Sequence, residues 1–401
     1  KPESGWTARE ISARLTLING SSQDQYFAKQ TVSAQSSEAS SASTFMIFAP
    51  ADKIQADTRY SVELVECGAD PGTGAVAQSR FPSSGDSALS ARETGVLKIA
   101  IVPVSANNML PDTSANALAV YRAYLMAMYP TTDVQLSVTA QISTASPINW
   151  NNLLDQIRQK RQSDAPAGDV YYYGFLKPAA TLREYCQSGC TAGVGFVAST
   201  SQPSTRAAVG LAFGDETSAS TMAHEVGHNH GRNHAPCAPG GQISGVDSNY
   251  PYANAALGVW GYDSRTRVLL DPTQGTDIMG YCNKKWVSDY TYKGLIERVA
   301  AINTNYDVIF GDTSTVANYR VLLLDEAGPR WSAPIPQSEA FGEPITAEVL
   351  DSHGASIQQI TVYRTEIGDA RNAFMVLVPE PQLGWHALQV LGWPALPFAT
   401  P

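Results

Sequence analysis

The pattern of apolar and polar positions predicts an N-terminal part built from short β-strands. Up to about residue 92, short apolar runs rich in Val, Ile, Tyr and Thr alternate with polar turns, a pattern typical of antiparallel strands. We expect a small sandwich with a mobile loop over residues 31–44, where Ser and Ala replace large side chains. The predicted strands span residues 13–18, 43–49, 59–67 and 75–81.

The middle of the chain shows strands that alternate with helices. Residues 96–104, VLKIAIVPV, are almost wholly apolar, as expected of a strand buried on both faces. A capping cluster at residues 112–114 precedes apolar residues at helical spacing, and Pro130 ends that pattern. The order of elements predicts a mixed sheet with right-handed crossovers. The further strands are predicted at 134–142, 169–176 and 207–213, a Gly-rich apolar segment at 193–198, and helices at 151–161 and from about 217.

Strand patterns return after residue 312 and predict a second small β-domain of roughly ninety residues. The fold class is therefore α/β (α+β), with a mixed twisted sheet in the middle and a small sandwich-like β-domain on each side. We predict domain bounds at 1–92, 93–311 and 312–401. The C-terminal strands are predicted at 319–324, 345–350, 357–364, 373–378 and 387–391.

Composition narrows the classes of function. The 401 residues include 27 Lys and Arg against 37 Asp and Glu, a formal charge of −10, which argues against binding to nucleic acid or anionic lipid. No apolar run reaches the roughly eighteen residues of a membrane helix, and the first residues lack the layout of a signal peptide. Few charges and five cysteines favour a secreted or cell-surface protein. We expect a soluble, processed monomer.

Four of the six histidines fall within the sequence HEVGHNHGRNH at residues 224–234. On a helix, His224 and His228 project from one face one turn apart, the separation at which two imidazoles bind one zinc ion. Glu225 lies beside that face, where it would act as general base for a water at the metal. Gly231 allows the chain to turn sharply and return His234 as the third ligand. Three histidines leave one zinc position open, as in catalytic sites.

With the motif HExxHxxGxxH complete, the chain resembles the metzincin clan of zinc peptidases. The clan's second mark is a methionine-containing turn, to which residues 276–282, TDIMGYC, are similar. The resemblance implies that Met279 supports the metal site without binding the metal, and that a long helix follows at 290–301. It also implies that the hydroxyl of Tyr281 reaches the zinc or the oxyanion, as in astacins and serralysins, the alternative being an ordinary packed tyrosine.

The resemblance also implies a substrate-binding edge strand before the active-site helix. An extended peptide adds to such a strand through main-chain hydrogen bonds, whereas the alternative here is a simple loop. Candidate pocket walls are Arg206, Trp260 and Trp286, although tryptophan is more often a core residue. The expected edge strand consists of Gly193, Val194, Gly195, Phe196 and Val197.

Within the clan, several branches share the resemblance. Residues 221–225, TMAHE, are similar to the reprolysin (adamalysin) branch, although Ala235 stands where that branch has aspartate. The flanking β-domains and residues 286–290 look most like bacterial secreted metzincins of the StcE type, which cut glycoproteins. The sequence thus predicts a secreted zinc endopeptidase acting on proteins or glycoproteins, including mucin-like ones. The alternative hypothesis is an adhesion or glycoprotein-binding module with a vestigial metal site.

The cysteines predict two disulfide bonds. Cys186 and Cys190 are four residues apart, a spacing that suits a local bridge or, as the alternative, metal binding. Cys237 follows the third histidine and Cys282 lies in the methionine-containing turn, so a metal site that unites these segments would bridge them. Cys67 has no partner in these pairs. It is either a buried or incidental thiol or, as the alternative, a thiolate that takes the open position of the zinc.

The remaining histidines are assigned no chemistry. His230 adds nothing to the motif, and a solvent-facing or locally hydrogen-bonded side chain is favoured over a contact with substrate. His353 and His386 are isolated and are expected to be structural. The flanking domains carry no recognisable chemistry, and the sequence does not indicate calcium sites.

Overall fold

The computed structural model of the chain describes residues 5–66, 79–187, 189–239, 243–304, 317–337 and 339–398. The backbone contacts divide the chain into two compact units. The first unit comprises residues 1–93 and 262–271, and the second comprises residues 94–261 and 272–401. Among the described residues, no helix is long and apolar enough to pass through a bilayer.

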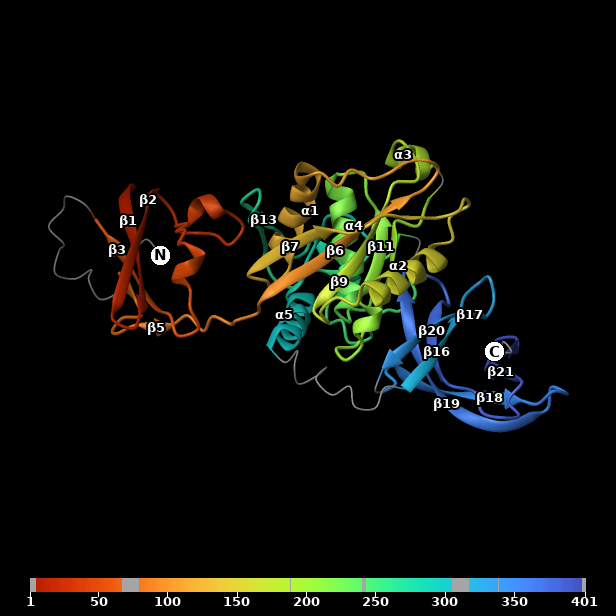
Figure 1. Cartoon of the computed structure of the whole chain (residues 1–401). Helices are drawn as coiled ribbons and strands as arrows, with labels where there is room; N and C mark the ends of the chain where they lie inside the picture. The colour runs from red at the N-terminus through yellow and green to blue at the C-terminus, as the bar shows by residue number, and fades with distance from the viewer. Residues whose placement is uncertain are drawn as a thin grey trace. The chain divides into compact units, whose positions relative to one another are not determined.

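The first unit is built from antiparallel strands (Figure 1). Its strands are β1 (Arg9–Asn19), β2 (Ser22–Val32), β3 (Arg59–Val65), β4 (Arg80–Phe81), β5 (Ser87–Ala88), β12 (Gly261–Asp263) and β13 (Val268–Leu270). β1 pairs with β2 on one side and with β3 on the other, and β4 and β5 both pair with β3. β12 and β13 form a separate ribbon. The buried side of β1 carries Ile11, Ala13 and Leu17.

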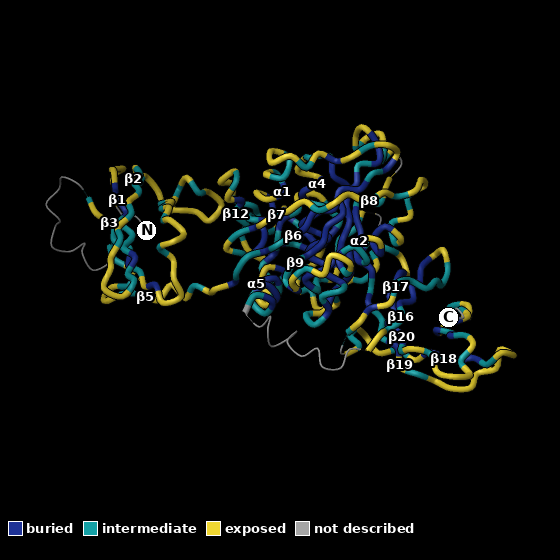
Figure 2. The backbone as a smooth tube through the Cα atoms, in the orientation of Figure 1, coloured by how far each residue is buried: buried dark blue, intermediate teal, exposed yellow. Residues whose placement is uncertain are grey.

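The second unit contains a mostly parallel central sheet. Its strands are β6 (Val96–Ser105), β7 (Asp133–Val138), β8 (Ile142–Ser143), β9 (Val170–Leu176), β10 (Gly193–Phe196) and β11 (Ala207–Leu211). β6 lies between β7 and β9, and β11 follows β9, all in parallel register, whereas β10 pairs with β11 in the antiparallel direction. Figure 2 shows β6 and β9 as mostly buried, in agreement with the almost wholly apolar sequence of β6.

Helices cover both faces of the central sheet. They are α1 (Ala115–Met128), α2 (Trp150–Asp164), α3 (Leu182–Tyr185), α4 (Glu216–Asn229) and α5 (Asp289–Thr304). On one face, Leu153 and Ile157 of α2 pack in a core with Tyr172 of β9. On the other face, Tyr121 of α1 packs against Phe175, with ring centroids 4.6 Å apart, and α1 also contacts α4. Because side chains alternate along β9, Tyr172 and Phe175 face opposite helix layers.

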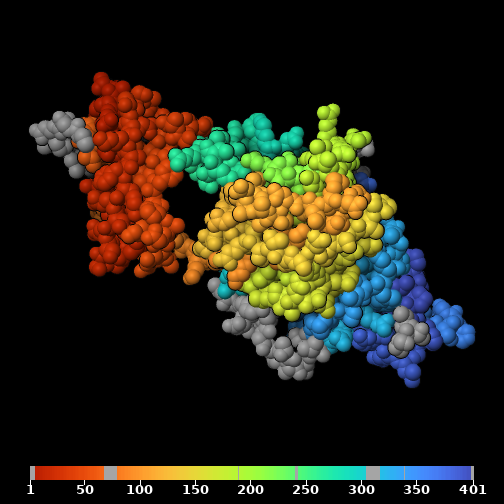
Figure 3. All heavy atoms as spheres, turned by 45° about the horizontal axis from the view of Figure 1, so that its top comes forward, coloured from red at the N-terminus to blue at the C-terminus, as the bar shows by residue number. Residues whose placement is uncertain are grey.

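The C-terminal strands continue the central sheet. They are β16 (Ala317–Leu324), β17 (Arg330–Gln337), β18 (Glu343–Leu350), β19 (Ser356–Gly368), β20 (Phe374–Pro379), β21 (Ala387–Val390) and β22 (Leu396–Pro397). β19 pairs with β10 at Gly195↔Gly368 and Phe196↔Ile367, so the order runs β17-β16-β20-β19-β10-β11-β9-β6-β7. Figure 3 shows the atoms of the C-terminal segment, in blue, beside the yellow part of the same unit. This pairing brings the turn after β19 next to the central strands.

The structure confirms a mixed α/β architecture, but not the sandwich form of the flanking parts. The strand predicted at 43–49 is wrong, because this segment forms a short 3-10 turn followed by chain without a strand. The strand β2 was not predicted because its sequence, SQDQYFAKQTV, is largely polar. The prediction at 75–81 lies mostly outside the described residues. Two further strands, β14 (Thr276–Asp277) and β15 (Lys285–Trp286), pair beside the histidine motif, and the three-domain division stays a prediction.

Candidate metal centre

Helix α4 positions the first two histidines of the motif. Asp215 caps its N-terminus by accepting a hydrogen bond from the backbone N–H of Ser218 at 2.8 Å. His224 and His228 follow one turn apart on the helix, and both side chains are buried. The helix thus presents two imidazoles to the same place in the interior.

The chain turns sharply after α4 and returns the third histidine. Gly231 has a φ of 76°, in the left-handed region that glycine adopts without strain. Its N–H donates to the carbonyl of His228 at 2.8 Å, which closes the turn. His234 follows and is buried beside the first two histidines. The turn lies where the motif spacing predicts it.

Backbone carbonyls fix the orientation of the three imidazole rings. Because a carbonyl can only accept, each Nδ1 carries the hydrogen and each Nε2 keeps a free lone pair. In this tautomer the Nδ1–H groups donate from His224 to Ile278 at 2.7 Å, from His228 to Arg232 at 2.7 Å, and from His234 to Ser244 at 2.6 Å.

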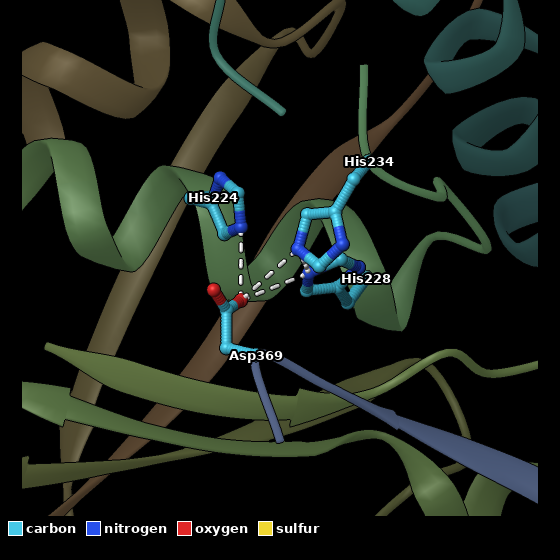
Figure 4. Close-up of side chains that lie close together, drawn as sticks. All are labelled: His224, His228, His234 and Asp369. Carbon is cyan, nitrogen blue, oxygen red and sulfur yellow. Dashed lines mark hydrogen bonds and ion pairs between the residues drawn. The ribbon is translucent and has the colours of Figure 1, made fainter. Parts of the chain in front are cut away.

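The three Nε2 atoms converge on one carboxylate oxygen, as Figure 4 shows. Oδ2 of Asp369, directly after β19, lies 3.0 Å from Nε2 of His224, 3.1 Å from that of His228 and 3.4 Å from that of His234. Burial alone would raise the pKa of Asp369, but the histidines around it hold that pKa well below its usual value. The carboxylate of Asp369 thus lies at the point on which the three Nε2 atoms converge.

This donor set fits a metal ion. The four candidate ligand atoms of His224, His228, His234 and Asp369 all lie within 4.8 Å of one another. Burial lowers the pKa of His228 to about 4, which keeps its imidazole in the neutral form that binds metals. Neutral imidazole nitrogens with a carboxylate oxygen are ordinary ligands of zinc.

Glu225 lies beside the ligand set and is only 2% exposed. Its Oε2 atom has no hydrogen-bond partner within the part of the chain that the structure describes. Burial and the nearby Asp369 carboxylate both raise the pKa of Glu225 well above its usual value. A cavity of about 280 Å³ is lined by Glu225, His224, Tyr281 and Lys285 among others, so Glu225 borders space beside the histidines.

Tyr281 reaches the same point from the methionine-containing turn. Its hydroxyl donates to Oδ1 of Asp369 and lies 3.1 Å from Nε2 of His234. Burial, together with the charge of Asp369, raises the pKa of Tyr281, so the phenol stays protonated at neutral pH. Tyr281 is therefore a hydrogen-bond donor at the edge of the ligand set.

Met279 packs against helix α4. Its side chain is buried, and a Cβ added at Gly227 of α4 would lie 2.5 Å from the Met279 sulfur. The carboxylate of Asp277 accepts hydrogen bonds from the N–H groups of Met279 at 2.7 Å and Ser288 at 2.9 Å. These bonds hold the turn in place below the histidines.

Both suggested pairs of cysteines are present as disulfide bonds. Cys186 is bonded to Cys190 within one loop. Cys237 is bonded to Cys282, which joins the segment after His234 to the methionine-containing turn. Cys67 lies outside the described residues.

The expected edge strand at 193–197 is wrong over its second half. β11 occupies one side of β10, and β19 occupies the other side at Gly195 and Phe196. The N–H of Val197 also donates to the carbonyl of Glu366 at 3.0 Å. Within the described part of the chain, Gly193 and Val194 of β10 have no strand partner on the side that faces β19. The expectation failed because the partner strand lies far along the chain.

The other candidates have structural positions. Arg206 is fully buried and its guanidinium donates to the carbonyls of Gly168 and Thr200. Trp286 is also buried, and neither side chain lines the cavity beside Glu225, nor does the partly buried Trp260. His230 is buried, bonds the carbonyl of Val226 and stacks on Tyr171. These are roles in the core, not in a pocket wall, and His230 is not solvent-facing.

Two residues at the site were missed by sequence reasoning. Asp369 follows the last strand-like run of β19, in a region to which no chemistry was assigned, and carries no local signal of a ligand. Lys285 follows the methionine-containing turn and lines the cavity beside Glu225. Its position six residues after Met279 was the only available hint.

Residues 199–316 match the model of the Peptidase M66 family. This family consists of zinc metallopeptidases, so the match supports a metallopeptidase over the segment that holds the histidine motif. No curated protein matches the chain. A solved structure titled "Structure of a chaperone-substrate complex" is 14% identical, covers 66% of this chain and 40% of its own, and aligns with a TM-score of 0.28. A similarity at that level carries no argument about fold or function.

Proposed function

We propose that this chain is a secreted zinc endopeptidase of the metzincin type that hydrolyses peptide bonds in proteins or glycoproteins. The observation that carries the proposal is the convergence of three histidine Nε2 atoms beside a buried carboxyl, Glu225, at a cavity. The match of residues 199–316 to a metallopeptidase family supports the same reaction class.

In this proposal His224, His228 and His234 hold one zinc ion. When bound, zinc polarises the scissile carbonyl and lowers the pKa of the attacking water. Glu225 accepts the proton of that water and passes it to the leaving amine. Its burial supports this role, because a carboxyl whose pKa is raised is a stronger base than an exposed one.

Tyr281 and Met279 have separate proposed roles. The Tyr281 hydroxyl, a protonated donor beside His234, would hydrogen-bond the oxyanion that forms on the carbonyl of the substrate. Met279 would keep α4 and its two histidines in place from below, without touching the metal.

The finer parts of the proposal concern substrate and location. The two disulfide bonds support an oxidising compartment outside the cytosol. The likeness to StcE-type secreted enzymes supports glycoprotein substrates, including mucin-like ones, with the reprolysin type as the other branch. We propose a monomer that acts on a protein or glycoprotein substrate and binds no nucleic acid.

The test compares zinc-loaded wild type with Glu225→Ala on a mixture of unfolded proteins and mucin-like glycoproteins, each with and without a chelator. New N-termini are then sequenced. We expect new termini only when both the metal and Glu225 are present. Cleavage that persists after both changes would contradict the proposal, and tight glycoprotein binding without cleavage would favour an adhesion module.

A further inference from the structure

The carboxylate of Asp369 lies where the reacting groups of a metallopeptidase meet. Its Oδ2 faces the Nε2 atoms of all three histidines at 3.0 to 3.4 Å, and its Oδ1 accepts the hydrogen bond of Tyr281. The Asp369 side chain thereby occupies the position that faces the three Nε2 atoms. It also engages the hydroxyl of Tyr281, the group that we propose as the donor to the oxyanion. A substrate carbonyl would need the same two partners.

Neighbouring backbone blocks the strand that would bind an extended peptide. β19 pairs with β10 in the antiparallel direction up to Gly368, the residue before Asp369. Main-chain addition to β10 is the binding mode expected of a peptide substrate, and β19 already makes those bonds over Gly195 and Phe196. The chain thus supplies a strand and a carboxylate together, as a bound peptide would supply a strand and a carbonyl.

The end of β19 packs closely against the histidines. A Cβ added at Gly368 would lie 2.5 Å from the ring of His228, so only glycine lets the backbone approach the ligand set this closely. Behind it, Ile367 is buried in the core shared with β10 and β11, and Thr365 hydrogen-bonds Gln202. The position of Asp369 is therefore set by packing along the strand that precedes it.

We propose that Asp369 is the fourth ligand of the metal centre and that, with β19, it holds the peptidase in a latent form. The latent form rests on the proposed function, whereas the ligand assignment does not. A zinc site with three histidines and a carboxylate is closed, whereas catalytic zinc sites keep one position open. Activation then requires that Asp369 leaves the histidines, and movement of the end of β19 away from β10 would in addition free Gly195 and Phe196 for a peptide.

Because Asp369 belongs to the same chain as the histidines, it competes strongly with a free peptide for the metal position. A ligand tethered to its own site acts at a high effective concentration, so a free peptide displaces it only in part. The zinc-loaded wild type should therefore cleave slowly. Removal of the carboxylate should open the site while the three histidines stay in place.

The experiment measures metal binding and cleavage separately in wild type, Asp369→Ala and Asp369→Asn. Zinc affinity is measured by competition with a chromophoric chelator, and the visible spectrum of the cobalt(II) form reports the ligand set. Cleavage is measured on unfolded casein, with Glu225→Ala added to each protein as the blank. Glu380→Ala, which removes an exposed carboxylate directly after β20, is the matched control.

We expect Asp369→Ala to weaken zinc binding by at least about tenfold, to change the cobalt spectrum and to raise the cleavage rate by at least about tenfold. Asp369→Asn keeps the size of the side chain and should likewise weaken zinc binding, change the cobalt spectrum and raise the cleavage rate, which guards against misfolding of the alanine variant. Glu380→Ala should match wild type in every measurement.

Each opposite result decides a different point. Unchanged zinc affinity and cobalt spectrum in both Asp369 variants would overturn the ligand assignment. A cleavage rate that is equal to wild type, or lower, in Asp369→Ala would overturn latency while leaving the endopeptidase standing. If no zinc-loaded protein cleaves casein above its Glu225→Ala blank, the proposed function fails, and the affinity data still decide the ligand assignment.

Discussion

At the residue scale, the site is defined by the hydrogen-bond partners of its buried polar atoms. The carbonyl partners at Nδ1 leave the Nε2 atoms of His224, His228 and His234 free to bind. Most of this set was predictable, because the motif spacing on a helix dictates which residues share a face. Asp369 was not predictable, because it lies 145 residues from His224 and nothing in its local sequence marks a ligand.

Tyr281 gives the first test at this scale. Tyr281→Phe removes one hydrogen-bond donor and little volume, so we expect kcat to fall roughly 10²-fold with KM nearly unchanged. Steady-state kinetics on a short peptide, in an Asp369→Ala background, measure this directly. Unchanged turnover would reduce Tyr281 to a packing role.

The buried His230 predicts a pH effect on stability. Burial lowers the pKa of His230 to about 3 in the folded chain, against 6.5 for an ordinary histidine. Between these values the unfolded chain binds a proton that the folded chain does not, so stability falls as the pH falls through this window.

We therefore expect metal-free wild type to lose about 2–3 kcal/mol more than His230→Phe between pH 7 and pH 4.5. Urea unfolding at both pH values measures the difference, and the other buried histidines cancel in the comparison. Equal losses in the two proteins would show that His230 is not the group responsible.

At the scale of elements, helix α4 depends on ties to the sheet and to the methionine-containing turn. The side-chain amide of Asn229, at the last residue of α4, donates to the carbonyls of Phe196 and Ala207 at 2.9 Å each. The helix and its motif were predictable from sequence. The hydrogen bonds of Asn229 were not predictable, because they depend on strands that only the folded sheet brings to the end of the helix.

Asn229→Ala leaves two buried carbonyls without their donor. We expect the free energy of unfolding to fall by about 2–4 kcal/mol. Asn152→Ala, at an exposed position of α2, is the control and should change stability by less than about 0.5 kcal/mol. Denaturant titration measures the free energy of unfolding of both variants. Equally small losses in the two would show that the hydrogen bonds of Asn229 do not stabilise the fold.

The two disulfide bonds allow a second comparison between elements. Loop-closure entropy predicts a loss of about 4 kcal/mol when the Cys237–Cys282 bond, which spans 45 residues, is replaced by serines. The Cys186–Cys190 bond spans only 4 residues and should cost about 2 kcal/mol. We also expect faster zinc loss in the first variant only, since that bond joins two segments of the metal site. Equal zinc loss in both would contradict this assignment.

At the scale of the whole molecule, the unit that carries the motif is completed by C-terminal strands. The sequence predicted these strands as a separate small domain without chemistry. In the structure β19 pairs with β10 and delivers Asp369 to the histidines. Pairing between strands so far apart in the chain leaves no periodic signal, so neither the loss of the edge nor the added carboxylate was accessible from sequence.

The most direct test of a zinc endopeptidase measures bound metal and hydrolysis in the same samples. Asp369→Ala is prepared with Glu225 retained and with Glu225→Gln, and zinc content and the rate of peptide cleavage are determined for each. We expect one zinc ion per chain in both proteins and hydrolysis only where Glu225 is retained. Equal hydrolysis by the two proteins, or full hydrolysis after the zinc has been removed, would contradict this expectation.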